Sequence, residues 1–340
     1  MDSRRIGRTW IAGQPTPPVR DISFASLELA EFNRRMTQQA PQATGGLGTH
    51  FVLLLNVALV STSFPVGAAI THALDPAALN CVRFALATAV FAVLVTLRGE
   101  WRRPAPKDLL RYLLLAASLV GFFVAMFEAL RLTSAINTSA LFTLVPLFSA
   151  AIALALAGQR TPLRQLAFMV LAAFGALWVV FKGSLANALA LSLGQGDLIF
   201  LAGALSFAFF SPLTRRLDVG ENLLSQTFWT LLVGTAMLAL IGSASLMKME
   251  WQAVPAVAWS GIVYLAIFTT AVTFYLVKFA SLRLPSAKVM SYNYLTPSFV
   301  VLMEAIRTGG MPEPMILVGA AITALAMLFL QLSVTPPAKR

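Results

Sequence analysis

Apolar runs of about 20 residues recur along the chain from residue 49 onward, and short polar breaks separate them. A helix needs about 20 apolar residues to cross the hydrocarbon of a bilayer, so each run predicts one membrane-spanning helix. The breaks hold Asp75-Pro76, Thr161-Pro162 and Leu284-Pro285, which are typical of turns. The ten predicted helices cover residues 49–70, 77–97, 109–130, 134–157, 163–181, 197–215, 223–243, 255–279, 287–306 and 315–334.

The composition agrees with a chain dissolved mostly in lipid. Of its 340 residues, 58% are hydrophobic and 11% are charged, whereas soluble domains carry about 45–50% and about 25%. The net charge of +11 comes from residues scattered through short loops, without the basic-aromatic surface of a nucleic-acid-binding protein. A single cysteine, Cys81, excludes an intrachain disulfide, and two histidines, His50 and His72, are too few for most histidine metal centres. We therefore expect no metal and no cofactor.

The basic residues predict the orientation. With a cytoplasmic N-terminus, the inside segments hold nineteen of the 25 lysines and arginines and the outside segments hold four. Basic residues concentrate in cytoplasmic loops, so both termini are predicted to be cytoplasmic in a multi-pass protein of the cell inner membrane. Residues 1–48 are predicted to form a disordered tail without a signal peptide, and either Met1 or Met36 could be the start. Residues 335–340 form a second tail.

An internal repeat divides the chain into two halves. Residues 122–135 and 274–287 are identical at seven of fourteen positions with a constant offset of 152, including Leu-Arg-Leu at 130–132 and 282–284. Five helices per half is an odd number, so the second half must insert with the opposite orientation. The predicted fold is all-α and polytopic, with ten transmembrane helices in two inverted five-helix repeats, residues 49–181 and 197–334, joined by a linker at 182–196. This architecture is typical of secondary transporters.

The sequence resembles the EamA-like branch of the drug/metabolite transporter (DMT) superfamily over nearly all of residues 49–332. The segments that carry the resemblance are Ser61-Thr62-Ser63-Phe64-Pro65, Pro76 with Arg83-Phe84, Ala129 to Ala135, Leu144 to Phe148, Gly196-Asp197 with Arg215-Arg216, and Tyr294 to Pro297. The chain departs from the family in Gly158-Gln159 and Gly310-Met311, where Gly-Glu is usual, and in lacking a tryptophan in the first helix.

The resemblance implies a secondary transporter, with an exporter as the leading interpretation. Its expected substrates are small organic metabolites such as amino acids or drug-like compounds, moved by alternating access. A metabolite importer and a flippase of lipid-linked substrates are the alternatives, and proton coupling and the choice between monomer and homodimer stay open. An enzyme is not expected, because neither an intramembrane protease motif nor a nucleotide-binding Gly-x-x-x-x-Gly-Lys-Ser/Thr occurs.

Charged residues inside predicted spans are candidates for function, since each costs roughly 2.5–3.5 kcal/mol in the bilayer centre. Arg83 lies deepest, and it either binds a substrate carboxylate or holds its own helix in place. Glu128 and Lys278 lie near helix ends, where their side chains can reach the interface. Glu304 is three residues from Arg307, which predicts an ion pair.

Prolines and aromatic residues complete the predicted site. Prolines within spans free backbone carbonyls and favour hinges; the four predicted hinge residues are Pro65, Pro146, Pro212 and Pro297. A lining of aromatic and weakly polar residues suits a substrate with an apolar body and one or two polar groups. The predicted substrate-binding residues are Ser63, Phe64, Arg83, Phe123, Asn137, Phe142, Trp229, Tyr275, Tyr292 and Asn293.

Overall fold

The chain is helical throughout its described part. The computed structural model describes residues 46–181, 184, 186, 194–309 and 314–333, and no strand occurs among them. These residues all belong to one compact unit, residues 42–339. The predicted tails, 1–48 and 335–340, and the predicted linker, 182–196, lie mostly outside the described residues.

The helices follow the predicted apolar runs, with bounds that differ by a few residues. The α-helices are α2 (Leu47–Ile70), α3 (Pro76–Arg98), α4 (Pro106–Leu130), α5 (Ala135–Phe142), α6 (Val145–Ala157), α7 (Leu163–Val180), α9 (Gln195–Ala208), α10 (Phe210–Arg216), α11 (Leu223–Ile241), α12 (Ser243–Lys248), α13 (Ala256–Ala266), α14 (Thr273–Ser281), α15 (Ser286–Ser291), α16 (Thr296–Thr308) and α17 (Pro314–Leu332). A π-helix, η2 (Ile267–Val272), joins α13 to α14, and two 3-10 helices are η1 (Trp251–Ala253) and η3 (Tyr292–Leu295).

Turn chemistry begins and ends several helices where the sequence predicts breaks. The Asp75 carboxylate accepts hydrogen bonds from the backbone N–H groups of Ala77 and Ala78, which caps α3. The same helix ends at Gly99, whose φ of 64° is the left-handed conformation that glycine adopts without strain. The hydroxyl of Ser134 caps α5 by accepting from the Asn137 N–H. The end of α4 at Leu130 and the Ser134 cap of α5 therefore confirm the boundary between the third and fourth predicted spans.

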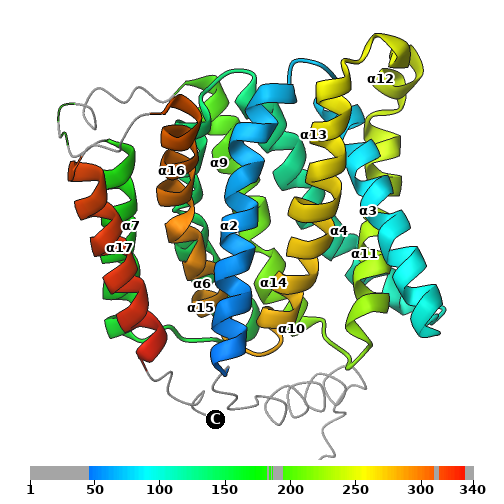
Figure 1. Cartoon of the computed structure of the whole chain (residues 1–340). Coiled ribbons are helices and arrows are strands. Elements are labelled where there is room, and N and C mark those ends of the chain that lie inside the picture. Colours follow the sequence, from blue (N-terminus) through cyan, green and yellow to red (C-terminus); the bar gives the residue numbers. More distant parts are fainter. Residues whose placement is uncertain (1–45, 182–183, 185, 187–193, 310–313, 334–340) are drawn as a thin grey trace, which may run out of the picture. The chain divides into compact units, whose positions relative to one another are not determined.

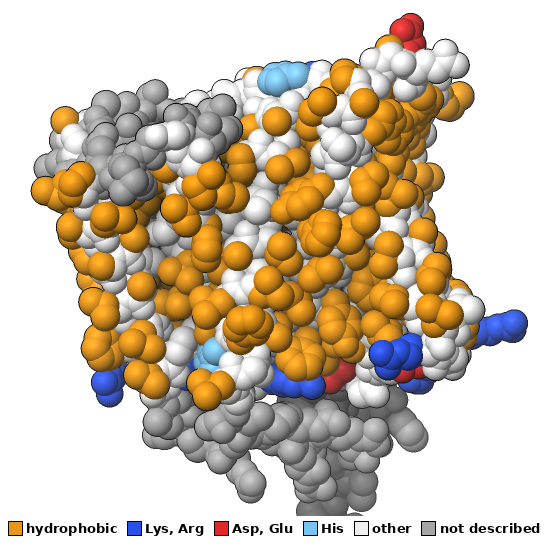
Figure 2. All heavy atoms as spheres, in the orientation of Figure 1, with side chains coloured by type: hydrophobic (Ala, Val, Ile, Leu, Met, Phe, Trp, Pro, Cys, Tyr) orange, Lys and Arg blue, Asp and Glu red, His pale blue; other side chains and the backbone are white. Residues whose placement is uncertain are grey.

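Nine helical segments in the described part are long and apolar enough to cross a membrane. The predicted span 287–306, which falls on α15, η3 and α16, is not among them. The count of ten therefore stays a prediction. Large side chains such as Leu97 and Leu240 are exposed on the surface. In Figure 2 hydrophobic side chains cover the middle of the visible face, and Lys and Arg side chains gather along its lower edge. Such a surface suits lipid, and the chain is a multi-pass membrane protein.

Three long-range helix pairs have the most extensive contacts, namely α7 with α17, α4 with α9 and α3 with α11. Helices α7 and α17 lie side by side in Figure 1. Their backbones cross closely at Gly175 and Gly319, where a Cβ atom on Gly175 would lie 2.9 Å from the Gly319 carbonyl oxygen. Small residues permit this approach, which stabilises helix pairs in lipid through van der Waals contact.

Candidate functional site

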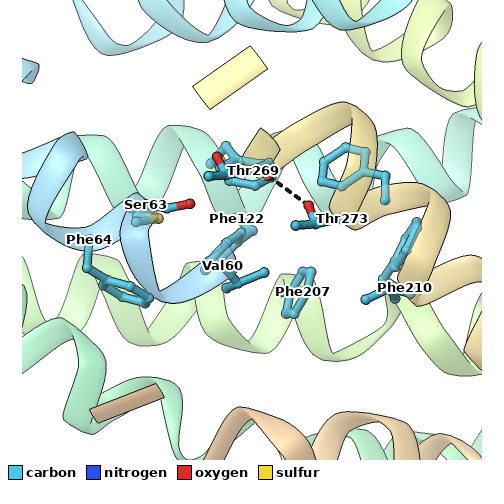
Figure 3. Close-up of a pocket in the computed structure, with 12 residues that line it drawn as sticks. Val60, Ser63, Phe64, Phe122, Phe207, Phe210, Thr269 and Thr273 are labelled. Atoms are coloured by element: carbon cyan, nitrogen blue, oxygen red, sulfur yellow. Dashed lines mark hydrogen bonds between the residues drawn. The ribbon is translucent and has the colours of Figure 1, made fainter. Parts of the chain in front are cut away.

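A narrow cavity lies between α2, α4, the α9–α10 segment and the η2–α14 segment (Figure 3). Its volume of about 20 Å³ is room for about one water molecule. The lining residues are Val60, Ser63 and Phe64 from α2, Phe122, Phe123 and Met126 from α4, Phe207 from α9, Phe210 from α10, Thr269 from η2, and Thr273, Phe274 and Val277 from α14. An organic molecule can enter only if these side chains move apart.

Phenylalanine rings form most of the cavity wall. The Phe122 ring is the centre of this cluster, 4.8 Å from Phe207 and 5.5 Å from Phe142 between ring centroids. Phe142, on α5, also lies 5.5 Å from Phe64 and so packs behind the wall rather than in it. The faces and edges of these rings offer an apolar surface that also attracts cations.

Arg83, on α3, is fully buried beside this cavity. Its Nη2 donates hydrogen bonds to the Thr269 hydroxyl (2.9 Å) and to the Thr269 carbonyl oxygen (3.1 Å). Its Nε donates to the Thr270 hydroxyl. The guanidinium carbon lies 4.1 Å from the centroid of the Phe123 ring, a cation–π contact. Phe123 and Thr269 both line the cavity, so the cation is separated from it by a single layer of side chains.

The charge of Arg83 has no acidic partner among the described side chains. The helices packed against α3 carry two acidic residues in their described parts, Asp108 and Glu128 on α4, and both pair with other arginines. The Nη1 atom of Arg83 is buried without a hydrogen-bond partner among the described residues. An uncompensated cation and an unsatisfied donor are both costly in a membrane interior, which is why such groups commonly mark functional sites.

The π-helix η2 presents the two threonines that hold Arg83. The Thr269 and Thr270 hydroxyls both donate to the carbonyl oxygen of Leu265, at 3.1 and 2.9 Å, four and five residues back. Such π-turns are frequent at functional sites. The Thr273 hydroxyl then donates to the Thr269 carbonyl oxygen at 2.8 Å (Figure 3).

Three of the predicted substrate-binding residues line the cavity, and two more adjoin it. Ser63, Phe64 and Phe123 contribute to the wall, while Arg83 and Phe142 contact wall residues. The other nine wall residues were missed, among them Phe207, Phe210, Thr269 and Thr273. The spacing of Thr269 and Thr273, four residues apart in an apolar helix, was the signal that could have found the two hydroxyls.

The other five predicted residues lie outside the cavity wall. The Trp229 Nε1–H donates to the Arg102 carbonyl oxygen, and the Tyr275 ring is 6.3 Å from the Phe91 ring. The Tyr292 hydroxyl is hydrogen-bonded to His50 Nδ1 at 2.6 Å. The side-chain amides of Asn137 and Asn293 donate to groups close by in the sequence, the Thr133 hydroxyl and the Met290 sulfur.

Two of the predicted hinge prolines directly follow interruptions of the regular α-helix, although the backbone there keeps right-handed helical dihedral angles. Pro146 occupies the first turn of α6 after the break that separates it from α5. Pro297 occupies the first turn of α16 after the 3-10 segment η3. Pro212 lies in α10, just after the boundary with α9 at Phe209, whereas α2 continues through Pro65. The two matched prolines therefore stand at matched interruptions of the α-helix.

A second buried polar cluster lies at the opposite end of α11 from α12. The Arg111 Nη2 donates to the Glu221 carboxylate, which also accepts from the Tyr112 hydroxyl at 2.6 Å. Lys278 is fully buried and donates to the Gln226 carbonyl oxygen at 3.0 Å and to the Thr230 hydroxyl at 2.7 Å. The expectation that Lys278 reaches the interface is therefore wrong. Glu128, half-exposed, pairs with Arg131 at 3.5 Å near its helix end. The side chain of Glu304 lies outside the described residues.

The family comparison matches the chain twice. The model of the EamA-like transporter family matches residues 47–181 and again residues 194–332. The chain is 25% identical over 256 residues to the uncharacterized transporter YyaM of Bacillus subtilis, covering 75% of this chain and 84% of that protein. It is also 25% identical over 276 residues to a probable terminal-alkyne amino-acid exporter of Streptantibioticus cattleyicolor, covering 80% and 89%.

A solved crystal structure shares the fold. It superposes with a TM-score of 0.64 at 19% sequence identity, and the match covers 82% of this chain and 97% of the other. At this identity the likeness concerns the arrangement of the helices alone.

Proposed function

The chain belongs to the EamA-like transporter family, and we propose from this premise that it is a secondary transporter that exports small organic metabolites across the cell inner membrane. The observation that carries the proposal is the closed aromatic cavity between four membrane-spanning segments, with the buried cation of Arg83 beside it. The name of the Streptantibioticus cattleyicolor relative, a probable terminal-alkyne amino-acid exporter, favours export over uptake. Amino acids are accordingly the first substrates to test.

The helix contacts support two equivalent five-helix repeats, residues 49–181 and 197–334, which in our proposal have opposite orientations because five helices per half is an odd number. Helix α4 packs on α9, and the corresponding segment of the second half, α13 to α14, packs on α2. Helix α11 packs on α4, and α3 packs correspondingly on α13 and η2. The two matches of the family model fall on the same two halves. We propose that the protein has ten transmembrane helices related in this way.

Alternating access follows from this architecture. The cavity takes side chains from both halves, from α2 and α4 in the first and from α10 and α14 in the second. When one half rocks against the other, the cavity opens to one side of the membrane and then to the other. Its small volume corresponds in this proposal to the closed intermediate, and the interruptions before Pro146 and Pro297 supply the hinges.

Metabolite profiling tests the proposed function. Cells that overproduce the protein are compared with cells that produce the Arg83→Ala variant at the same membrane level and with cells that lack it, and metabolites are measured inside and outside. We expect a small set of compounds to accumulate in the medium of the wild-type producer alone. Accumulation inside the cells would indicate import instead. No change in any soluble metabolite would contradict transport of this class and favour a lipid-linked substrate.

A further inference from the structure

We propose that Arg83 binds the carboxylate of the substrate, and that the cavity takes a molecule with one carboxylate and an apolar or aromatic body. This inference rests on the proposed transport function and names its substrate class. Three observations carry it, namely the missing counter-charge, the free donor and the shape of the wall beside them.

The missing counter-charge comes first. Arg83 is fully buried in a membrane-spanning helix, and no described acidic side chain pairs with it. Hydroxyl and carbonyl oxygens of Thr269 and Thr270 solvate the guanidinium but leave its charge uncompensated. A carboxylate supplied by the substrate would provide both the charge and a planar acceptor that matches the guanidinium fork.

The free donor comes next. Nη1 of Arg83 has no partner among the described residues, although the side chain makes three other hydrogen bonds. Lys278, the other fully buried cation among the described side chains, donates to two groups of α11, Gln226 and Thr230, neither of which lines the cavity. The geometry therefore favours Arg83 over Lys278 as the anchor for an anion.

The wall separating Arg83 from the cavity is one aromatic ring. Phe123 contacts the guanidinium on one side and lines the cavity on the other. In the proposal this ring turns aside as the substrate enters, so that a carboxylate replaces a cation–π contact with a charge-assisted hydrogen bond. The remaining phenylalanines then enclose the apolar body, and the hydroxyls of Ser63 and Thr273 offer hydrogen bonds to one further polar group.

Three probes of similar size show which charged group of a ligand the cavity binds. L-Phenylalanine carries a carboxylate and an ammonium group, 3-phenylpropanoate carries the carboxylate alone, and 2-phenylethylamine carries the ammonium alone. Binding to the purified protein in detergent is measured by calorimetry. Both carboxylates are expected to bind and 2-phenylethylamine to bind at least about tenfold more weakly, which corresponds to one charge-assisted hydrogen bond. Phenylalanine binding more tightly than 3-phenylpropanoate would identify an amino acid as the preferred source of the carboxylate.

Two variants test the role of Arg83 itself. Arg83→Gln is expected to weaken the binding of both carboxylates by at least about tenfold while leaving 2-phenylethylamine unchanged. Arg83→Lys keeps the charge without the planar fork and should retain an intermediate affinity. Arg131→Gln is the matched control, because this arginine is exposed and pairs with Glu128 away from the cavity. If Arg83→Gln does not fold, the order of affinities of the three probes for the wild-type protein still shows whether the site selects a carboxylate.

The outcomes separate this inference from the proposed function. Transport of the three probes is measured in proteoliposomes alongside binding. Equal binding and transport of 2-phenylethylamine and the carboxylates would overturn the carboxylate site while leaving the transporter function standing. Carboxylate-selective binding without transport of any probe would support the site and count against the function. No binding of either carboxylate to the wild-type protein would overturn the inference.

Discussion

The two buried arginines in the described part of the protein, Arg83 and Arg111, have opposite environments. Arg83 lacks an acidic partner among the described side chains, whereas Arg111 is paired with Glu221 and both side chains are almost fully buried. Removing one member of a buried ion pair leaves the other charge uncompensated, which is far more costly than losing an exposed pair. We therefore expect a change at Arg83 to weaken substrate binding and a change in the Arg111–Glu221 pair to lower the stability of the protein.

Glu221→Gln is expected to destabilise the protein strongly. The substitution removes the closer of the two carboxylates around the buried Arg111 guanidinium, leaving Asp108 at 3.8 Å, and it weakens the hydrogen bond from Tyr112. We expect the free energy of unfolding to fall by roughly 3–5 kcal/mol, measured on the purified protein by titration with a denaturing detergent.

Glu128→Gln is the matched control for that measurement. Its carboxylate pairs with Arg131 at 3.5 Å where both side chains are about 40% exposed. The expected loss is at most about 1 kcal/mol, with transport retained. Equal losses for the two variants would mean that the Arg111–Glu221 pair is solvated in the folded protein.

At the scale of elements, the close crossing of α7 and α17 depends on Gly175. A Cβ atom at this position would lie 2.6 Å from the Thr323 hydroxyl and 2.9 Å from the Gly319 carbonyl oxygen, so the two helices must separate. Gly175→Ala is expected to cost about 1–3 kcal/mol of stability through overpacking. Gly48→Ala, in α2, meets nothing within 4 Å and should be neutral. Thermal unfolding of both variants measures the difference, and an unchanged midpoint for Gly175→Ala would contradict the close crossing.

We expect replacement of Pro146 and Pro297 by alanine to change the transport rate rather than the affinity for the probes. Alanine at both positions restores a backbone N–H group, which favours continuous helices across the two interruptions. If these segments are hinges, the transport rate should fall about tenfold while probe affinity changes by less than about twofold. Rates in proteoliposomes and affinities in detergent measure the two quantities separately. A parallel loss of affinity and rate would instead assign the prolines to the shape of the cavity.

Hydropathy and turn residues in the sequence predicted most helices to within a few residues, but they predicted the site only in part. In lipid, side chains that face the bilayer and those that face the protein interior are both apolar, so no amphipathic pattern separates them. Tyr275 and Trp229 therefore looked as suitable for the cavity as Phe207 did. The burial of Lys278 and the π-turn at Thr269 depend on tertiary contacts with α11 and α3, which the local sequence does not encode.

At the scale of the whole molecule, the basic residues and the repeat make a joint prediction about topology. Arg131 and Arg283 occupy equivalent positions of the two halves, and opposite insertion would place the segments around them on opposite sides of the membrane. The gathering of Lys and Arg side chains along one edge in Figure 2 fits a cytoplasmic location for that edge. Parallel repeats would instead place the two segments on the same side.

Single cysteines in a Cys81→Ser background test this topology. Leu132 and Arg283 are both exposed, so Leu132→Cys and Arg283→Cys can each react with a membrane-impermeant maleimide. We expect Leu132→Cys to be labelled in intact cells and Arg283→Cys to be labelled only after the membrane is permeabilised. Labelling of both in intact cells would contradict inverted repeats, because two equivalent segments of oppositely inserted halves cannot face the same side. The reverse pattern would keep the inverted repeats but place both termini outside, against the distribution of positive charge.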